Sequence, residues 1–145
     1  MVHLYWHKKR LVALGPKIGG LPDTHPAKPQ CLFRLSWLFN SVGNYAGGKQ
    51  LLIHTLKLRR ERGDDSQVAR ILVSLSNTNR LLGLRSEGIP QAKEALGICE
   101  LLNDMPGQAH CLTYLARLLC SDKQLNAAQE AAARATELFP EKEGH

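Results

Sequence analysis

Ten side chains in this 145-residue sequence belong to types that commonly bind metals or act as nucleophiles: four cysteines and six histidines. The cysteines are Cys31, Cys99, Cys111 and Cys120, and no two of them have the CxxC spacing that structural zinc sites use. A chain of this size does not need a disulfide scaffold, so we expect reduced thiols in an intracellular protein. His110 next to Cys111 is the strongest metal candidate, but buried, non-ligating thiols explain these cysteines better. We therefore predict no metal and no cofactor.

The sequence also lacks the patterns of an enzyme active site. No histidine pairs with a serine or cysteine in a nucleophile motif. Gly47 and Gly48 are followed by Lys49 and Gln50, so the lysine–threonine ending of a phosphate-binding loop is not complete. Four basic residues crowd residues 57–62, where they complement the dipole at a helix end better than they explain contact with nucleic acid. We predict a non-catalytic protein.

The elements that position these residues repeat every 40 residues. Apolar, small and turn residues coincide when the sequence is shifted by 40: Leu32, Leu72 and Leu112; Leu35, Leu75 and Leu115; Leu58, Ile98 and Leu138; Gly43 and Gly83; Gly48, Gly88 and Ala128. The small residues at the last of these positions predict a close approach of two helices. Composition allows such a fold, because 43% of residues are hydrophobic and only 6% are aromatic. The sequence contains no run of 18 uncharged apolar residues, so no transmembrane helix is expected.

Each repeat is expected to fold as two helices. The predicted pairs lie at about 31–41 and 45–62, at about 68–82 with a second helix entered near Pro90, and at about 108–120 and 125–138. Gly43 and Gly83 suit helix C-caps, and Asp65 or Ser66 is expected to cap the third of these helices. Asp122 and Lys123 depart from the pattern, because they stand where an apolar residue and a glycine are expected.

The first 29 residues differ from this repeating body. They contain four prolines and three glycines, so we predict a flexible basic segment with a helix no longer than about 4–14. Residues 1–30 hold five basic side chains and one acidic side chain, whereas the other 115 residues hold fourteen and twelve. A presequence or a nucleic-acid contact through His7–Arg10 are alternatives for this segment. The predicted domains are therefore 1–29 and 30–145, with repeats at about 30–65, 66–105 and 106–145.

These repeats resemble the tetratricopeptide repeat family. The third repeat carries the resemblance best, through Leu112, Leu115, Ala116, Leu119, Ala128, Ala132, Ala135 and Pro140. The 40-residue period and the endings LKLRRERGDD and ALGICELLND are similar to the longer variant found in kinesin light chains and in the tails of fungal and bacterial sensor ATPases. The resemblance implies an all-α fold, a right-handed superhelix of about three helical hairpins that follows a poorly structured N-terminal segment.

The resemblance further implies a concave groove, lined by the first helix of each repeat, that binds a peptide or a helix. Carried onto this sequence, its lining positions are Arg34, Trp37, Asn40, Arg70, Ser74, Asn77, Arg80, His110, Tyr114 and Arg117. Four of these are arginines and none is a carboxylate. Since guanidinium groups pair with carboxylates, the expected ligand is acidic.

The leading functional prediction is an interaction scaffold that binds an acidic segment of a partner protein. The alternatives are a sensor or regulatory tail of a larger signalling ATPase and, less favoured, an RNA-binding helical repeat. No membrane partner is expected, the predicted location is the cytoplasm with the nucleus left open, and an uncapped last hairpin predicts self-association.

Overall fold

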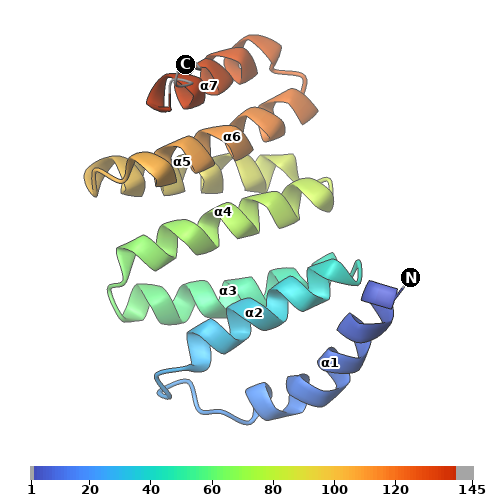
Figure 1. Ribbon diagram of the computed structural model, residues 1–145. Helices are drawn as coiled ribbons and strands as arrows, with labels where there is room; N and C mark the ends of the chain where they lie inside the picture. The colour runs from blue at the N-terminus through green and yellow to red at the C-terminus, as the bar shows by residue number, and fades with distance from the viewer. Residues whose placement is uncertain (1, 140–145) are drawn as a thin grey trace, which may run out of the picture. The chain divides into compact units, whose positions relative to one another are not determined.

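The computed structural model describes residues 2–139, and within that range it contains seven helices and no strand (Figure 1). Their bounds are α1 Val2–Gly19, α2 Lys28–Ser41, α3 Tyr45–Glu61, α4 Asp65–Leu81, α5 Arg85–Leu101, α6 Met105–Ser121 and α7 Leu125–Leu138. The chain divides into two compact units, Met1–Asp64 and Asp65–His145, which we call the N-terminal and C-terminal units. The predicted boundary after residue 29 lies inside the N-terminal unit. The positions predicted at Pro140 and beyond lie outside the described residues.

The helices pair as the 40-residue register predicts. In the N-terminal unit α2 packs against α3 and also against α1. In the C-terminal unit α4 pairs with α5 and α6 pairs with α7, while α6 also packs on α5 and α4. The register positions that were expected to be apolar form the core, with Leu32, Leu72 and Leu112 each at most 3% exposed. The all-α hairpin architecture is thereby confirmed.

The five turns between α2 and α7 share one geometry. Each has a left-handed residue, at Gly43, Gly63, Gly83, Asn103 and Lys123, with φ between 53° and 83°. The amide of the next residue donates to a carbonyl five residues earlier over 2.8–3.1 Å, which is the Schellman arrangement that closes a helix. Lys123 therefore adopts the conformation of the glycine it replaces. The departure noted in the sequence changes the residue but leaves the turn intact.

Small residues lie where the helices approach most closely. A Cβ added to Gly88 would stand 3.0 Å from the Ser76 carbonyl oxygen and 2.9 Å from Leu118 Cδ2. One added to Gly48 would collide with the Asn40 side chain. Ala128 at the third equivalent position is 8% exposed. The close approach predicted at these positions is confirmed.

Helix α1 is longer than predicted. It spans 18 residues and contains Pro16, whereas the sequence predicted a helix no longer than about 4–14. Contacts beyond the helix explain the difference. Lys28 is 3% exposed, and its ammonium donates to the carbonyl oxygens of Ile18, in the last turn of α1, and of Leu21, just beyond the helix, over 3.0 and 2.6 Å. It supplies a positive charge where the helix dipole is negative. The predicted flexibility of residues 1–29 stays a prediction.

The loop between α1 and α2 is held by α3 as well. The Arg62 guanidinium donates to the carbonyl oxygens of Asp23, His25 and Pro26 over 2.9–3.2 Å. His54 Nε2 lies 2.9 Å from the Asp23 carboxylate. His54 of α3 and Arg62, which follows α3, thus position the loop that precedes α2.

Three smaller expectations were wrong. Helix α4 begins at Asp65, so Asp65 and Ser66 lie inside the helix and neither is its N-cap. Helix α5 begins at Arg85, so Pro90 lies in its second turn rather than its first. The reason is that the Schellman turn at Gly83 is short, and only three residues separate the end of α4 from the start of α5. Helix α2 begins three residues earlier than expected, with Pro29 in its first turn.

Candidate partner-binding surface

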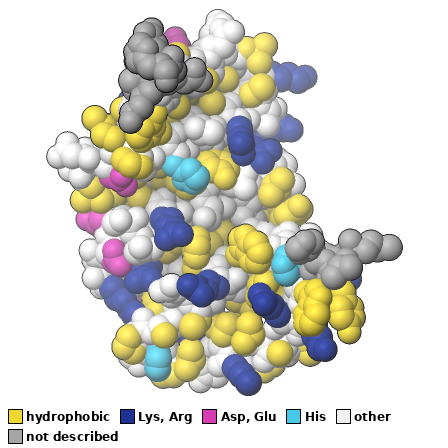
Figure 2. Space-filling view, in the orientation of Figure 1, with side chains coloured by type: hydrophobic (Ala, Val, Ile, Leu, Met, Phe, Trp, Pro, Cys, Tyr) yellow, Lys and Arg dark blue, Asp and Glu magenta, His cyan; other side chains and the backbone are white. Residues whose placement is uncertain are grey.

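Charge is divided unequally between the two units. The N-terminal unit holds eleven basic and three acidic residues, and the C-terminal unit holds eight basic and ten acidic residues. The face drawn in Figure 2 shows blue and yellow side chains intermingled over α1 and α2, with the acidic side chains of that view elsewhere. The positive charge that the sequence placed in residues 1–30 therefore extends through α2 and α3.

In the C-terminal unit, seven of the predicted groove residues lie on two adjacent helices. Arg70, Ser74, Asn77 and Arg80 follow one another at helical spacing along α4, and His110, Tyr114 and Arg117 do the same along α6. Because α4 and α6 are in contact, the structure brings these two rows together. Arg70, His110 and Arg117 are exposed, while Ser74, Asn77, Arg80 and Tyr114 are partly buried.

Arg70 and His110 line the same pocket, about 420 Å³ in volume, between the N-terminal halves of α4 and α6. Asp104 lines it too, so this part of the surface is not free of carboxylates as the sequence suggested. The Asp104 carboxylate accepts the Gly107 amide over 3.0 Å and caps α6. Its charge is therefore already committed to the helix N-terminus, and Arg70 is the cation on the opposite wall.

The predicted residues of α6 contact one another along the helix. The rings of His110 and Tyr114 meet edge to face with centroids 4.9 Å apart, and the Arg117 guanidinium lies 5.2 Å from the Tyr114 ring centroid. A cation over an aromatic ring is attracted to its π face. This contact orients the Arg117 guanidinium beside the Tyr114 ring.

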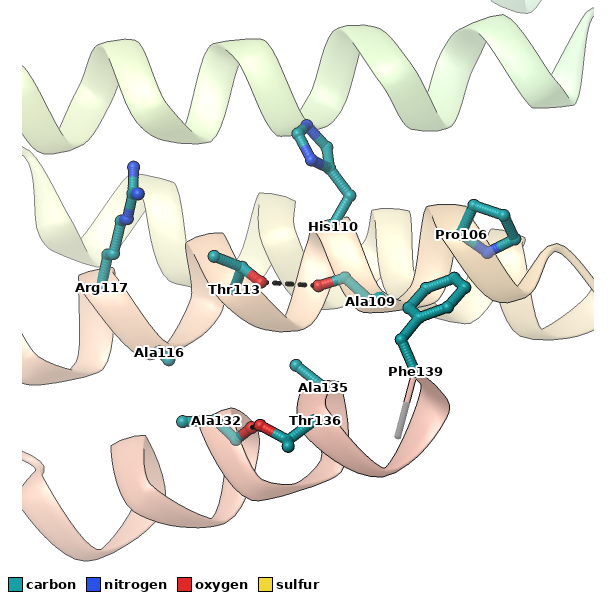
Figure 3. Close-up of a pocket in the computed structure, with 10 residues that line it drawn as sticks. All are labelled: Pro106, Ala109, His110, Thr113, Ala116, Arg117, Ala132, Ala135, Thr136 and Phe139. Atoms are coloured by element: carbon teal, nitrogen blue, oxygen red, sulfur yellow. Dashed lines mark hydrogen bonds between the residues drawn. The ribbon is translucent and has the colours of Figure 1, made fainter. Parts of the chain in front are cut away.

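His110 and Arg117 also border a second pocket, about 640 Å³, between α6 and α7 (Figure 3). In that view both side chains extend from α6 on the side of α4, while alanine and threonine side chains of α6 and α7 face each other. The apolar wall is completed by Phe139, which is 52% exposed.

One residue that was predicted to contact the peptide, Asn77, already forms hydrogen bonds with a neighbouring side chain. The Asn77 amide oxygen accepts two hydrogen bonds from the Arg80 guanidinium, over 3.2 and 2.9 Å. Asn77 can therefore meet a peptide only through its amide N–H groups. The same bonds hold Arg80 against α4, which reduces the side-chain entropy that Arg80 would lose on binding.

In the N-terminal unit the structure separates the three predicted residues of α2. Arg34 and Trp37 line a pocket together with residues of α1, and the His7 ring meets Trp37 edge to face at 5.2 Å. Asn40 instead points at Gly48 of α3 and lies in the α2–α3 interface. The sequence analysis missed Arg10 and Leu14 of α1, which line the pocket with Arg34 and Trp37. The basic run His7–Arg10 was the sequence signal for Arg10, and no pattern marked Leu14.

The expectation of buried thiols holds for two of the four cysteines. Cys99 and Cys111 are buried, with their Sγ atoms 3.9 Å apart across α5 and α6, whereas Cys31 is only partly buried and Cys120 is exposed. Burial raises the pKa of the Cys111 thiol to about 12, and it also raises the pKa of Cys99. Both thiols are therefore neutral near pH 7 and behave as small apolar groups of the core. The core position predicted for Cys111 is confirmed.

Comparison with known proteins places the fold. No family model matches the chain, and no curated protein matches its sequence. BtubC from P. vanneervenii has a similar structure, with a TM-score of 0.81, 12% identity, and coverage of 96% of this chain and 57% of that chain. A Podosopora anserina kinesin light chain with nearly identical TPR-like repeats aligns with a TM-score of 0.82 and 14% identity, over 96% of this chain and 70% of its own. A substituted form of that kinesin light chain aligns with the same TM-score over 91% of this chain and 66% of its own.

This chain thus spans between 57% and 70% of the length of these structures. The alignments cover nearly the whole chain, although the sequence identity is low. Within residues 2–139, no helix combines the length and hydrophobicity needed to cross a bilayer. The fold of this protein is that of TPR-like helical repeats, as the resemblance in its sequence implied.

Proposed function

We propose that the protein is a non-catalytic interaction scaffold that binds an acidic segment of a partner protein on the α4–α6 face of the C-terminal unit. The observation that carries this proposal is the meeting of the two rows, which together hold three arginines, Arg70 and Arg80 on α4 and Arg117 on α6. The unit as a whole holds more acidic than basic residues. A cationic face on such a unit needs a local reason, and an acidic ligand supplies one.

The geometry also suits recognition of an extended peptide. The pocket that Arg70 and His110 share can take one side chain, and the Tyr114 ring beside it offers an amphipathic contact surface. Guanidinium groups that are already oriented, such as those of Arg80 and Arg117, lose little freedom when they bind a carboxylate. Stacked helical hairpins are a scaffold on which such surfaces are built from exposed residues without disturbing the core.

The test is the charge-reversal variant Arg70→Glu/Arg117→Glu in the full chain. Its binding to an array of fluorescein-labelled acidic peptides, and to the same peptides with Lys in place of Asp and Glu, is measured by anisotropy. We expect at least tenfold weaker binding of the acidic peptides, because each reversal replaces an attraction with a repulsion. The matched control is Arg85→Glu/Lys93→Glu, which makes the same charge change at exposed positions of α5. Equal loss in both variants, or no loss in the first, would overturn the proposed site.

A further inference from the structure

The pocket between α1 and α2 is a second candidate site, separate from the α4–α6 face. It has a volume of about 390 Å³, at the small end of the range for small-molecule sites. Its walls are four apolar side chains, Leu14, Phe33, Trp37 and Leu38, and two arginines, Arg10 and Arg34. One arginine comes from each helix, so the site exists only because α1 packs on α2.

The two guanidinium groups lie on helices that contain no carboxylate. Helices α1 and α2 have neither Asp nor Glu anywhere in their sequences. Of the three acidic residues in the N-terminal unit, Asp23 is 2.9 Å from His54 and Asp64 is 3.2 Å from Arg59. The third, Glu61, is the last residue of α3. Among the described residues, no carboxylate pairs with Arg10 or Arg34, so an anion that enters the pocket meets no competing negative group.

Two of the four apolar side chains of the pocket are exposed to solvent. Trp37 is 57% exposed and Leu14 is 39% exposed, although both border a concave surface. The His7 ring supports the Trp37 ring from one side at 5.2 Å, which fixes the indole as a wall of the pocket. A ligand with an apolar body would cover these side chains, and its anionic end would be met by the guanidinium groups.

We propose that this pocket binds a small amphiphilic carboxylate, of the chemical class of a medium-chain fatty acid. The alkyl chain lies against Leu14, Phe33 and Trp37, and the carboxylate accepts hydrogen bonds from Arg10 and Arg34. An inorganic anion would leave the apolar walls exposed, and a neutral or cationic amphiphile would leave the guanidinium groups without a partner. The site involves different residues from the proposed peptide face, so either can fail without the other.

Trp37 provides the assay, because the chain has only two tryptophans and Trp6→Phe leaves Trp37 as the reporter. Decanoate, below its micelle concentration, is titrated while indole fluorescence is recorded. Octanoate and dodecanoate are titrated in parallel, and we expect each added methylene to tighten binding by about three- to fourfold. Decanol and decyltrimethylammonium have the same chain with a neutral or cationic head, and we expect them to bind at least tenfold more weakly.

The matched variants identify the pocket. Arg10→Ala/Arg34→Ala should weaken decanoate binding at least tenfold, and Leu14→Asp should abolish it by placing a carboxylate in the site. Lys17→Ala/Lys57→Ala removes two exposed cations of the same unit outside the pocket and should change binding less than twofold. Circular dichroism checks that α1 remains helical in each variant. Equal binding of the three head groups, a flat chain-length series, or a Trp37 response confined to acidic peptides would overturn the proposal.

Discussion

Replacing Lys28 with methionine should release α1 from the N-terminal unit. Lys28 is 3% exposed, and its ammonium donates to Ile18 O over 3.0 Å and to Leu21 O over 2.6 Å. Methionine keeps an unbranched apolar stem of similar length but cannot donate. The substitution therefore removes both hydrogen bonds and the positive charge at the C-terminal end of α1, while it leaves the packing of the stem nearly unchanged.

The magnitude follows from these two bonds. A hydrogen bond with one charged partner contributes about 1.5–3 kcal/mol, but water can replace part of it, because Ile18 and Leu21 are only partly buried. We expect a loss of about 2–4 kcal/mol in the free energy that keeps α1 docked. At about 1.4 kcal/mol per factor of ten, the undocked population then rises at least about thirtyfold.

Hydrogen exchange followed by mass spectrometry measures this population directly, since amide protection in α1 reports the free energy of local opening. Peptides from residues 5–19 should exchange at least thirtyfold faster in Lys28→Met than in the wild type. Lys17→Met is the control, because Lys17 is an exposed lysine in the last turn of the same helix and should change exchange only slightly. Exchange that stays within twofold of the wild type in Lys28→Met would refute the role assigned to Lys28.

Three further substitutions test the C-terminal unit. Asn79 is fully buried, and its amide nitrogen donates to Gln91, whereas its amide oxygen has no hydrogen-bond partner. The double variant Asn79→Leu/Gln91→Ala, which copies the equivalent residues of the next hairpin, should therefore raise the free energy of unfolding by about 1–2 kcal/mol in urea denaturation. A less stable protein would show that the amide pair is needed. Lys123→Gly should stabilise by about 0.5–1 kcal/mol, because Lys123 has φ of 61°, and a lower melting temperature would contradict this. The raised pKa of Cys111, about 12 against 9 for an ordinary thiol, favours the neutral thiol in the folded state, so its stabilising contribution is present below pH 9 and is lost as the pH rises toward 12. Relative to Cys111→Ala, the free energy of unfolding of the wild type should fall by up to about 1.4 kcal/mol per pH unit above pH 9. Parallel curves of unfolding free energy against pH for the two proteins would contradict this prediction.

The hairpins could be predicted from the sequence because their determinants are local. A leucine stripe at helical spacing and a glycine at the turn act within a few residues, and both recur every 40 positions. The turns show where this signal ends. The left-handed residues recur every 20 positions, but Asn103 and Lys123 are not glycines, so the sequence does not reveal this spacing. The Schellman hydrogen bonds impose the conformation there against the local preference of lysine.

Helix α1 could not be predicted, since its stability depends on contacts distant in the sequence. Pro16 and the neighbouring glycines are poor helix formers, and local propensity argues for a short helix. Lys28 and Arg62 supply hydrogen bonds to carbonyl oxygens of residues 18–26, and no pattern in the sequence marks a backbone carbonyl as an acceptor. The pocket with Arg10 and Arg34 follows from this docking, so the sequence could suggest Arg34 and Trp37 as ligands but could not identify Arg10 and Leu14 as their neighbours.

The distribution of charge between the two units decides how the binding of an acidic peptide should respond to salt. The N-terminal unit, with eleven basic and three acidic residues, attracts any polyanion at low ionic strength, whereas the C-terminal unit has a small acidic excess. Binding of an acidic peptide to the N-terminal unit through this general field would fall steeply with salt and would tolerate scrambling of the peptide. Binding at the α4–α6 face cannot draw on a favourable net charge of its unit, so it must depend on the placed groups of Arg70, Arg80 and Arg117. Sequence-dependent binding that persists at about 0.3 M salt, where the Debye length is well below 10 Å, is therefore expected only from that face.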